Sequence, residues 1–391
     1  MAATIAALTE LKERPDTVAL LTQIWRRVLQ TDDVTPDSNF FDLGGDSLLA
    51  LTLFLEIERA TGRQLPITAI YDAQTVAEQC ALLRDETTVS EFSPLVLLKA
   101  GGEGPPLFMF HGIGGTVVEF AALGKLIETG GDVYAVQAQG LDGTLPPLDS
   151  VHDMAALYWR AIRERQPSGP YWLCGYSFGG LIAVEVARLA RKAGEEIGQL
   201  FLIDAYAHPV TWPRKSLLKV RLRKQLRSLA SIFRRSPRES LARLKARRNA
   251  RSSEGAHLSE QERRKAVEKR KQQWLTDTRP NLPLPLMQTR MAGDKAVYRY
   301  RHSHYPGSAI FLKARHPDPD FPDDPKHVWS RWIQNLRVYR CPGSHLTIVS
   351  DHAAGVADRI NACIREAKGL SAPGRASRLR RGAPLRGFAR A

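Results

Sequence analysis

YWLCGYSFGG, residues 171–180, is the stretch that decides the fold of this chain. Its first four letters form an apolar run typical of a buried strand, and an apolar-faced helix is predicted to follow it. Between them, GYSFG at 175–179 has the spacing of a sharp strand-to-helix turn in which only small residues fit around the serine. Such a turn exposes Ser177 Oγ at a helix N-terminus, where backbone dipoles favour negative charge. The flanking segments favour a nucleophile over the alternative, a glycine-rich turn with an idle serine.

A serine nucleophile needs a general base and a carboxylate that orients the base. His345 lies in the tight turn PGSHL after the last predicted strand, and His352 is its main rival. Asp204 ends the strand segment LFLID and is the predicted acid, while Asp351 lies on the wrong side of the histidine. The order serine, aspartate, histidine is typical of α/β-hydrolases.

An oxyanion formed at Ser177 also needs backbone N–H donors. The segment FHGIGG at 110–115 follows the first predicted core strand and provides the expected loop. We therefore expect the amides of Ile113 and Phe178 to form the oxyanion hole, and we interpret His111 as a structural residue of this loop.

The rest of the larger region shows strands alternating with helices, which predicts a mostly parallel sheet covered on both faces. Apolar runs predict strands at 107–110, 133–137, 171–174, 200–203, 310–312 and 338–340. Helical patterns fit 151–165, 178–193 and 352–368. The alternation breaks between Trp212 and Trp274, where a basic insert lies.

Residues 16–85 form a separate acidic unit with 5 basic and 11 acidic residues. Leu21, Ile24, Trp25 and Val28 have helical spacing, and three or four helices in this length predict a small bundle. In FDLGGDSL, Ser47 begins the second predicted helix, where free N–H groups favour a phosphodiester. The alternative is an ordinary capping serine.

Composition sets the limits for the whole chain. Its 391 residues are 43% hydrophobic, without an apolar run long enough to cross a membrane. The N-terminus lacks signal-peptide order, which indicates the cytoplasm, and the four scattered cysteines argue against disulfides or a metal site. The net charge of +15 is local, because residues 214–272 hold 21 Lys/Arg against 5 Asp/Glu and the tail 369–391 adds six arginines. The rest of the chain is net acidic, which argues against nucleic acid as the partner.

Two regions of the chain resemble known protein families. Residues 16–85, through FFDLGGDSL, resemble the carrier domains of nonribosomal peptide and polyketide synthases. Residues 95–368 resemble the type I thioesterase domain that ends such assembly lines. The matching stretches are LFMFHGIGG, LCGYSFGG, LFLIDAY, YRYRHSHYPGSAIFLKA and PGSHL.

These resemblances imply a small all-α carrier bundle followed by an α/β-hydrolase domain with a helical lid at about 212–274. A leader at 1–15, a linker at 86–94 and the basic tail complete the expected organisation. The resemblance implies 4′-phosphopantetheine on Ser47 and a triad of Ser177, Asp204 and His345. It also implies a phosphopantetheinyl transferase and upstream synthase proteins, such as adenylation or condensation proteins, as partners.

We therefore expect a serine thioesterase that releases a carrier-bound acyl or peptidyl chain by hydrolysis or cyclisation. An editing hydrolase that clears misloaded carriers is one alternative, and a basic binding or scaffold protein is another. In the basic insert, the spacing of Leu218, Leu222, Leu226, Leu229 and Phe233 predicts a lid helix with its apolar face on the acyl channel. Its basic residues Arg221, Arg223, Lys224 and Arg227 suggest attraction to an acidic carrier.

Overall fold

A computed structural model describes two folded regions and the segments around them. The described residues are 17–45, 47–63, 65, 69–84, 92–141, 143–206, 208–233, 284–316, 318 and 320–369. At 47, 48, 51, 55, 71, 72 and 224–233 the description covers the backbone alone. The expected leader, most of the linker, nearly all of the tail, Asp46 and lid residues 234–274 therefore lie outside the described residues.

The N-terminal region is a helical bundle, as the sequence predicts. Its helices are α2 (Thr17–Leu29), α3 (Ser47–Thr61), the short α4 (Ala69–Asp72) and α5 (Val76–Arg84). The predicted inward positions of α2, including Trp25, are all buried. Trp25 packs edge-on against Phe40 at 5.3 Å and donates its indole N–H to Gln79 Oε1 at 3.0 Å. Aromatic burial and a satisfied indole thus stabilise the bundle.

A seven-stranded sheet forms the second region, with the order β1-β3-β2-β4-β5-β6-β7. The strands are β1 (Leu95–Lys99), β2 (Leu107–Phe110), β3 (Val133–Val136), β4 (Tyr171–Tyr176), β5 (Ile197–Ile203), β6 (Tyr305–Ala314) and β7 (Ile333–Cys341). All neighbouring strands are parallel except β1, which pairs with β3 in the antiparallel direction. The six predicted strands are present, and edge strand β1 is additional.

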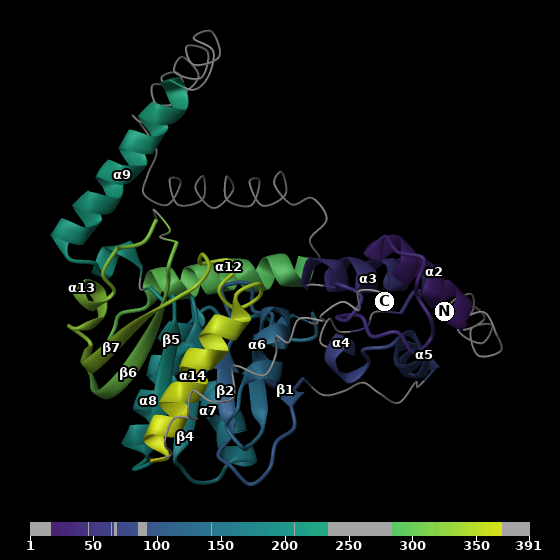
Figure 1. Ribbon diagram of the computed structural model, residues 1–391, viewed down its shortest axis with the longest axis horizontal. Coiled ribbons are helices and arrows are strands. Elements are labelled where there is room, and N and C mark those ends of the chain that lie inside the picture. Colours follow the sequence, from purple (N-terminus) through teal and green to yellow (C-terminus); the bar gives the residue numbers. More distant parts are fainter. Residues whose placement is uncertain are drawn as a thin grey trace, which may run out of the picture.

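Helices cover both faces of the sheet (Figure 1). On one face α7 (Val151–Arg165) and α8 (Gly179–Lys192) share an apolar core with alternate strand residues. On the other face α6 (Ala121–Leu126) and α14 (Ala353–Ala367) complete a second core. The buried, nearly continuous apolar strands are typical of a parallel sheet between two helical layers. The predicted α/β fold is thereby confirmed.

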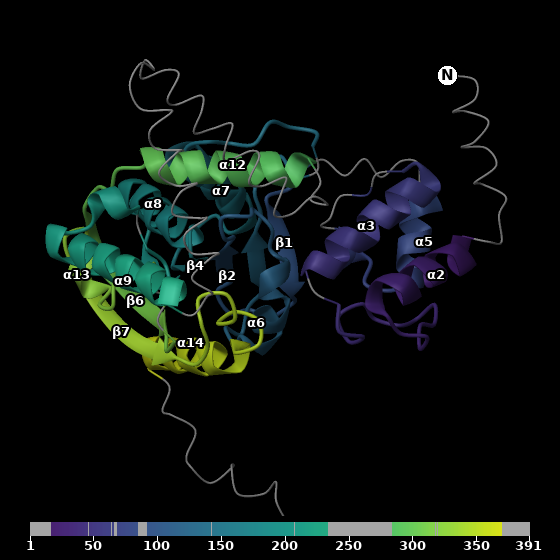
Figure 2. The ribbon, with the colours of Figure 1, turned by 90° about the horizontal axis from the view of Figure 1, so that it is seen from above.

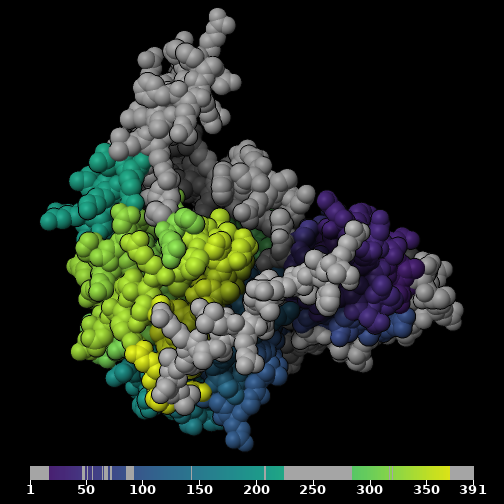
Figure 3. Space-filling view, in the orientation of Figure 1, coloured from purple at the N-terminus to yellow at the C-terminus, as the bar shows by residue number. Residues whose placement is uncertain are grey.

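The connection between β5 and β6, which includes the predicted lid at 212–274, contains α9 (Arg214–Phe233) and, after the predicted lid, α12 (Leu284–Arg299). Helix α12 crosses above the sheet, whereas α9 projects from the body (Figures 1 and 3). The predicted inward stripe of α9 is wrong at its start, because Leu218 is 68% exposed and Leu222 is 53% exposed. Ser216 and Val220 are buried instead. The remaining members, Leu226, Leu229 and Phe233, have no described side chains.

The helical bundle lies beside edge strand β1 and helix α6 (Figure 2). Lys125 Nζ of α6 lies 4.0 Å from Asp42 Oδ1 and 6.0 Å from the centre of the Phe41 ring. The bundle therefore contacts the sheet region through the loop that precedes Ser47. Among the helices in the described ranges, none is long and apolar enough to cross a membrane.

Candidate active site

Ser177 occupies the sharp turn between β4 and α8. Its φ of 52° is in the left-handed region, which non-glycine residues seldom adopt outside constrained sites. The turn needs glycines at both flanks, because a Cβ on Gly175 would lie 2.3 Å from the Gly179 carbonyl oxygen. A Cβ on Gly179 would lie 2.2 Å from the Phe110 carbonyl oxygen. The close backbone approach explains the GxSxG spacing and projects Ser177 from the strand end.

The structure brings Ser177, His345 and Asp204 together. Ser177 Oγ lies 3.0 Å from His345 Nε2, and His345 Nδ1 donates to Asp204 Oδ2 at 2.9 Å. The other oxygen, Asp204 Oδ1, accepts from the Ala314 backbone N–H at 3.2 Å. Both carboxylate oxygens are thus engaged on a side chain that is only 4% exposed. The arrangement orients the imidazole so that Nε2 can accept the serine proton.

The rival residues lie elsewhere. His352 immediately precedes α14, and its Nδ1 is buried without a hydrogen-bond partner in the described part of the chain. Asp351 is exposed. Neither side chain takes part in the hydrogen bonds that link Ser177, His345 and Asp204.

Tyr176, the residue before the serine, was not singled out by the sequence. Its hydroxyl donates to the His345 carbonyl oxygen at 2.7 Å, and its ring stacks on the imidazole at 5.5 Å. Burial raises the pKa of this phenol, so the hydroxyl remains protonated and able to donate. Tyr176 therefore holds both the backbone and the ring of His345. A tyrosine inside GxSxG gives no sign of this contact until the distant PGSHL turn is folded.

The loop 111–115, which contains Ile113, lies beside the turn of Ser177. Gly112 N donates to Glu119 Oε1 at 3.4 Å, and the Thr116 hydroxyl donates to Glu119 Oε2 at 2.9 Å. Within the described part of the chain, the amides of Ile113 and Phe178 donate no backbone hydrogen bond. Both N–H groups are therefore available to an oxyanion.

His111 has a structural place in this loop. Its Nδ1 donates to the Gly112 carbonyl oxygen at 2.7 Å, and its Nε2 accepts from the Tyr158 hydroxyl at 2.8 Å. Burial lowers the pKa of His111 to about 4, which keeps the ring neutral. Both ring nitrogens are occupied, so the histidine anchors the loop to α7.

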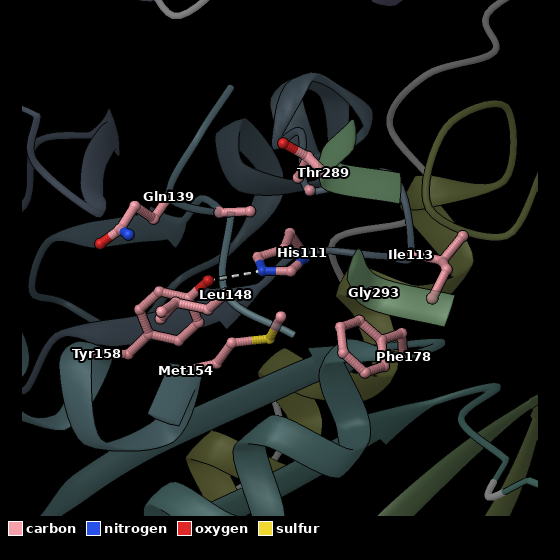
Figure 4. Close-up of a pocket in the computed structure, with 11 residues that line it drawn as sticks. His111, Ile113, Gln139, Leu148, Met154, Tyr158, Phe178, Thr289 and Gly293 are labelled. Carbon is pink, nitrogen blue, oxygen red and sulfur yellow. Dashed lines mark hydrogen bonds between the residues drawn. The ribbon is translucent and has the colours of Figure 1, made fainter. Parts of the chain in front are cut away.

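A narrow hollow lies next to Ile113 and Phe178, the residues whose amides are the oxyanion-hole candidates. Figure 4 shows side chains from the loop, α7 and α12 gathered around it. Ile113, Leu148, Met154 and Phe178 contribute apolar side chains to the lining, and polar side chains lie beside them at His111, Gln139, Tyr158 and Thr289. Helix α12 packs closely here, since a Cβ on Gly293 would lie 3.1 Å from the Ile113 carbonyl oxygen. The sequence did not indicate that α12 forms one wall of the hollow.

In the helical bundle, Ser47 is the first residue of α3. The preceding loop turns at Gly44, with a φ of 86°, and a Cβ on Gly45 would lie 2.3 Å from the Phe40 ring. Asn39 Oδ1 accepts from the amide of Phe41 at 2.9 Å and stabilises the same loop. The backbone thus places Ser47 at the N-terminus of a 15-residue helix. This position fits a serine-linked phosphate group.

A sheet with one sharp strand-to-helix turn, followed by an acid after β5 and a histidine after β7, defines an α/β-hydrolase. Comparison with known families is more specific. Residues 105–364 match the family described as "Thioesterase domain", and the chain belongs to this family. Residues 19–83 match the "Phosphopantetheine attachment site" family, so the bundle is a carrier domain for covalent 4′-phosphopantetheine.

Individual relatives agree with this organisation. The chain is 37% identical over 201 residues to a dimodular nonribosomal peptide synthase of Bacillus subtilis (strain 168), covering 51% of this chain and 8% of that protein. It is 32% identical over 210 residues to an indigoidine synthase of Streptomyces lavendulae, covering 52% and 16%. A solved holo four-domain nonribosomal peptide synthetase, bound to AMP and glycine, aligns with a TM-score of 0.53 and 25% identity. That alignment covers 89% of this chain and 26% of the solved one.

Proposed function

We propose that this carrier–thioesterase pair ends a biosynthetic assembly line, with Ser177 as nucleophile, His345 as general base and Asp204 as orienting acid. The observation that carries the proposal is the hydrogen-bonded series from Asp204 through His345 to Ser177 at a left-handed turn. A dimodular nonribosomal peptide synthase and a four-domain nonribosomal peptide synthetase contain segments similar to this chain, which supports a carrier-bound acyl or peptidyl substrate.

The first half of the reaction is acyl transfer to Ser177. As Ser177 Oγ bonds to the thioester carbonyl carbon, its proton passes to His345 Nε2 and the carbonyl oxygen becomes an oxyanion. The amides of Ile113 and Phe178 donate to that oxyanion. The carbon–sulfur bond then breaks, and His345 returns the proton to the departing sulfur. The product is an ester on Ser177.

In the release step Ser177 Oγ becomes the leaving group, and His345 again takes up and returns a proton. His345 Nε2 takes a proton from water, or from a nucleophile within the acyl chain, while that oxygen or nitrogen bonds to the ester carbon. When the second oxyanion collapses, the bond between the carbonyl carbon and Ser177 Oγ breaks and Ser177 recovers its proton from His345. The released product is a carboxylic acid or a cyclic compound. The Asp204 carboxylate stabilises the protonated imidazole.

The substrate reaches this site from the carrier domain. We assign the attachment of 4′-phosphopantetheine to Ser47, with the amides at the start of α3 adjoining the phosphate. The group supplies a thiol to which the acyl chain is joined as a thioester. A phosphopantetheinyl transferase and an upstream synthase module that supplies the acyl chain are the partners this requires.

The test follows the acyl group by intact-protein mass spectrometry. Carrier loaded by a phosphopantetheinyl transferase with an acyl-coenzyme A should lose its acyl group in the wild-type chain and keep it in Ser177→Ala. Ser168→Ala, at an exposed serine outside the site, is the matched control and should release normally. Loss of the acyl group from Ser177→Ala at the wild-type rate would exclude Ser177 as the nucleophile. The mass of the released product separates hydrolysis from ring closure.

A further inference from the structure

The imidazole of His345 contacts a second aromatic ring besides Tyr176. The Phe321 ring lies 5.0 Å from the imidazole centre, inclined by 50°. Phe321 belongs to the connection between β6 and the short helix α13 (Lys326–Trp329), far from the serine turn in the sequence. Ring contacts of this kind restrict the rotation of an imidazole that hydrogen bonds alone leave partly free.

The Phe321 ring also contacts a residue close to Asp204. It stacks on Tyr206 at 4.8 Å with an angle of 10° between the planes. Tyr206 is buried two residues after Asp204, and its hydroxyl accepts from Lys313 Nζ at 3.0 Å. The Phe321 ring thus bridges the end of β5 and the histidine turn.

The lid helix holds the same segment. Arg223 Nη1 of α9 forms an ion pair with Asp323 Oδ1 at 2.8 Å, and Nη2 donates to the Phe321 carbonyl oxygen at 3.3 Å. Val220 lies one turn before Arg223 and Ser216 two turns before it, and both are buried on this side of α9. A guanidinium that binds both a carboxylate and a carbonyl fixes the segment in position as well as direction.

We propose that Phe321 is a positioning residue for His345, and that Arg223 sets the place of Phe321. The seating of lid helix α9 is thereby coupled to the alignment of the base with Ser177. The proposal rests on the proposed function, in which His345 is the base. When α9 is displaced, the Phe321 segment loses two hydrogen bonds and the imidazole loses one of its ring contacts.

Hydrolysis of a small free acyl thioester, which needs no carrier docking, tests this coupling. Phe321→Ala should lower kcat by about 10- to 100-fold with little change in KM, because misplacement by about 1 Å costs rates of this order. Phe321→Leu should retain more activity than Phe321→Ala. Arg223→Gln should give a smaller loss in kcat, whereas Lys215→Gln, at an exposed residue of the same helix, should have none.

The decisive result is the double variant. If Arg223 acts through Phe321, adding Arg223→Gln to Phe321→Ala should lower kcat no further, and the swap Arg223→Asp with Asp323→Arg should recover part of the Arg223→Gln loss. Melting temperatures confirm that each variant is folded, and Phe321→Leu and Arg223→Gln provide the test if Phe321→Ala is not. Wild-type kcat in the Phe321 variants, or fully additive losses, would overturn the proposal while Ser177→Ala stays inactive. Activity in Ser177→Ala or His345→Ala would instead overturn the proposed function.

Discussion

Ser177 and Asp204 adopt the same left-handed backbone conformation, with φ values of 52° and 43°, directly after two neighbouring parallel strands. The Ser177 amide donates to the carbonyl oxygen of Ile203, the residue before Asp204, at 2.9 Å. The two turns are therefore joined by the backbone as well as through His345. Non-glycine residues in this region cost conformational energy, which the surrounding sheet offsets.

Asp204→Asn tests the role of the acid without disturbing the turn, because asparagine tolerates the left-handed conformation. Loss of the charge removes the stabilisation of the imidazolium and the preference for the correct tautomer. We expect kcat on a small thioester to fall by about four orders of magnitude with little change in melting temperature. Asp351→Asn, at an exposed residue, is the control and should behave as wild type. A mild Asp204→Asn variant would show that another group orients His345.

His345→Ala and His352→Ala separate the two candidate bases. His345→Ala should lower turnover by about three orders of magnitude or more, because proton removal and nucleophile activation fail together. His352→Ala should keep turnover near wild type, since His352 has no hydrogen bond to Ser177 or Asp204. Single-turnover assays with an acyl thioester measure both. The reverse result would contradict the assignment of the base.

Ser47→Ala tests the attachment site. Incubation with coenzyme A and a phosphopantetheinyl transferase should add one phosphopantetheine mass to the wild-type chain and none to the variant. Ser38→Ala, nine residues earlier in the connection between α2 and α3, is the control and should be modified fully. A mass gain in Ser47→Ala would move the attachment to another serine.

Two buried histidines make stability depend on pH. Burial lowers the pKa of His111 and of His302 from the ordinary 6.5 to about 4. Between pH 6.5 and 4, these two histidines are therefore protonated in the unfolded chain and neutral in the folded chain. The free energy of unfolding consequently falls as the pH drops through this range. Each histidine contributes up to about 3 kcal/mol to the fall.

Urea unfolding at a series of pH values measures this effect. His302→Phe, which keeps a ring against Trp329 and Trp332, should flatten the fall between pH 6.5 and 4. Ser168→Ala, at an exposed residue that does not titrate, is the control and should leave the slope unchanged. An unchanged slope in His302→Phe would mean that His302 takes up its proton equally in both states.

The basic face of α9 is suited to attract an acidic carrier, but not through every residue that the sequence suggested. Arg223 pairs with Asp323, and the side chains of Lys224 and Arg227 lie outside the description, so Lys219 and Arg221 are the exposed basic pair to reverse. Lys219→Glu with Arg221→Glu should slow acyl transfer from the carrier about three- to tenfold at low salt, and added salt should reduce the difference. Hydrolysis of a small thioester should barely change.

Reversal of Arg160 and Lys192, exposed on α7 and α8, controls for net charge. Equal slowing by this control pair would assign the effect to net charge. Equal slowing of carrier-bound and free substrates would mean that the lid shapes the site and does not attract the carrier.

The sequence predicted what short motifs and periodicity encode. The strand and helix that flank Ser177, the order of Ser177, Asp204 and His345, and the inward face of α2 are all local patterns, and the structure contains them. It did not predict contacts between distant segments, such as Tyr176 on His345 or α12 on the loop 111–115. The predicted inward-facing leucines at the start of α9 were wrong for the same reason. Leucine spacing indicated one face, whereas Val220 and the Arg223–Asp323 pair orient the other toward the body.

The direction of edge strand β1 determines where the carrier is tethered. Leu95 begins β1 opposite Val136, the last residue of β3, and Pro94 accepts a hydrogen bond from Gln137 at 2.9 Å. Because β1 is antiparallel, the chain enters the sheet at the rim where the parallel strands end and where Ser177 lies. From β1 to β4 is three strand spacings, about 14 Å. A parallel β1 would have anchored the tether at the opposite rim. The antiparallel direction of β1 thus raises the local concentration of a carrier-bound thioester at Ser177, without any added affinity between the domains.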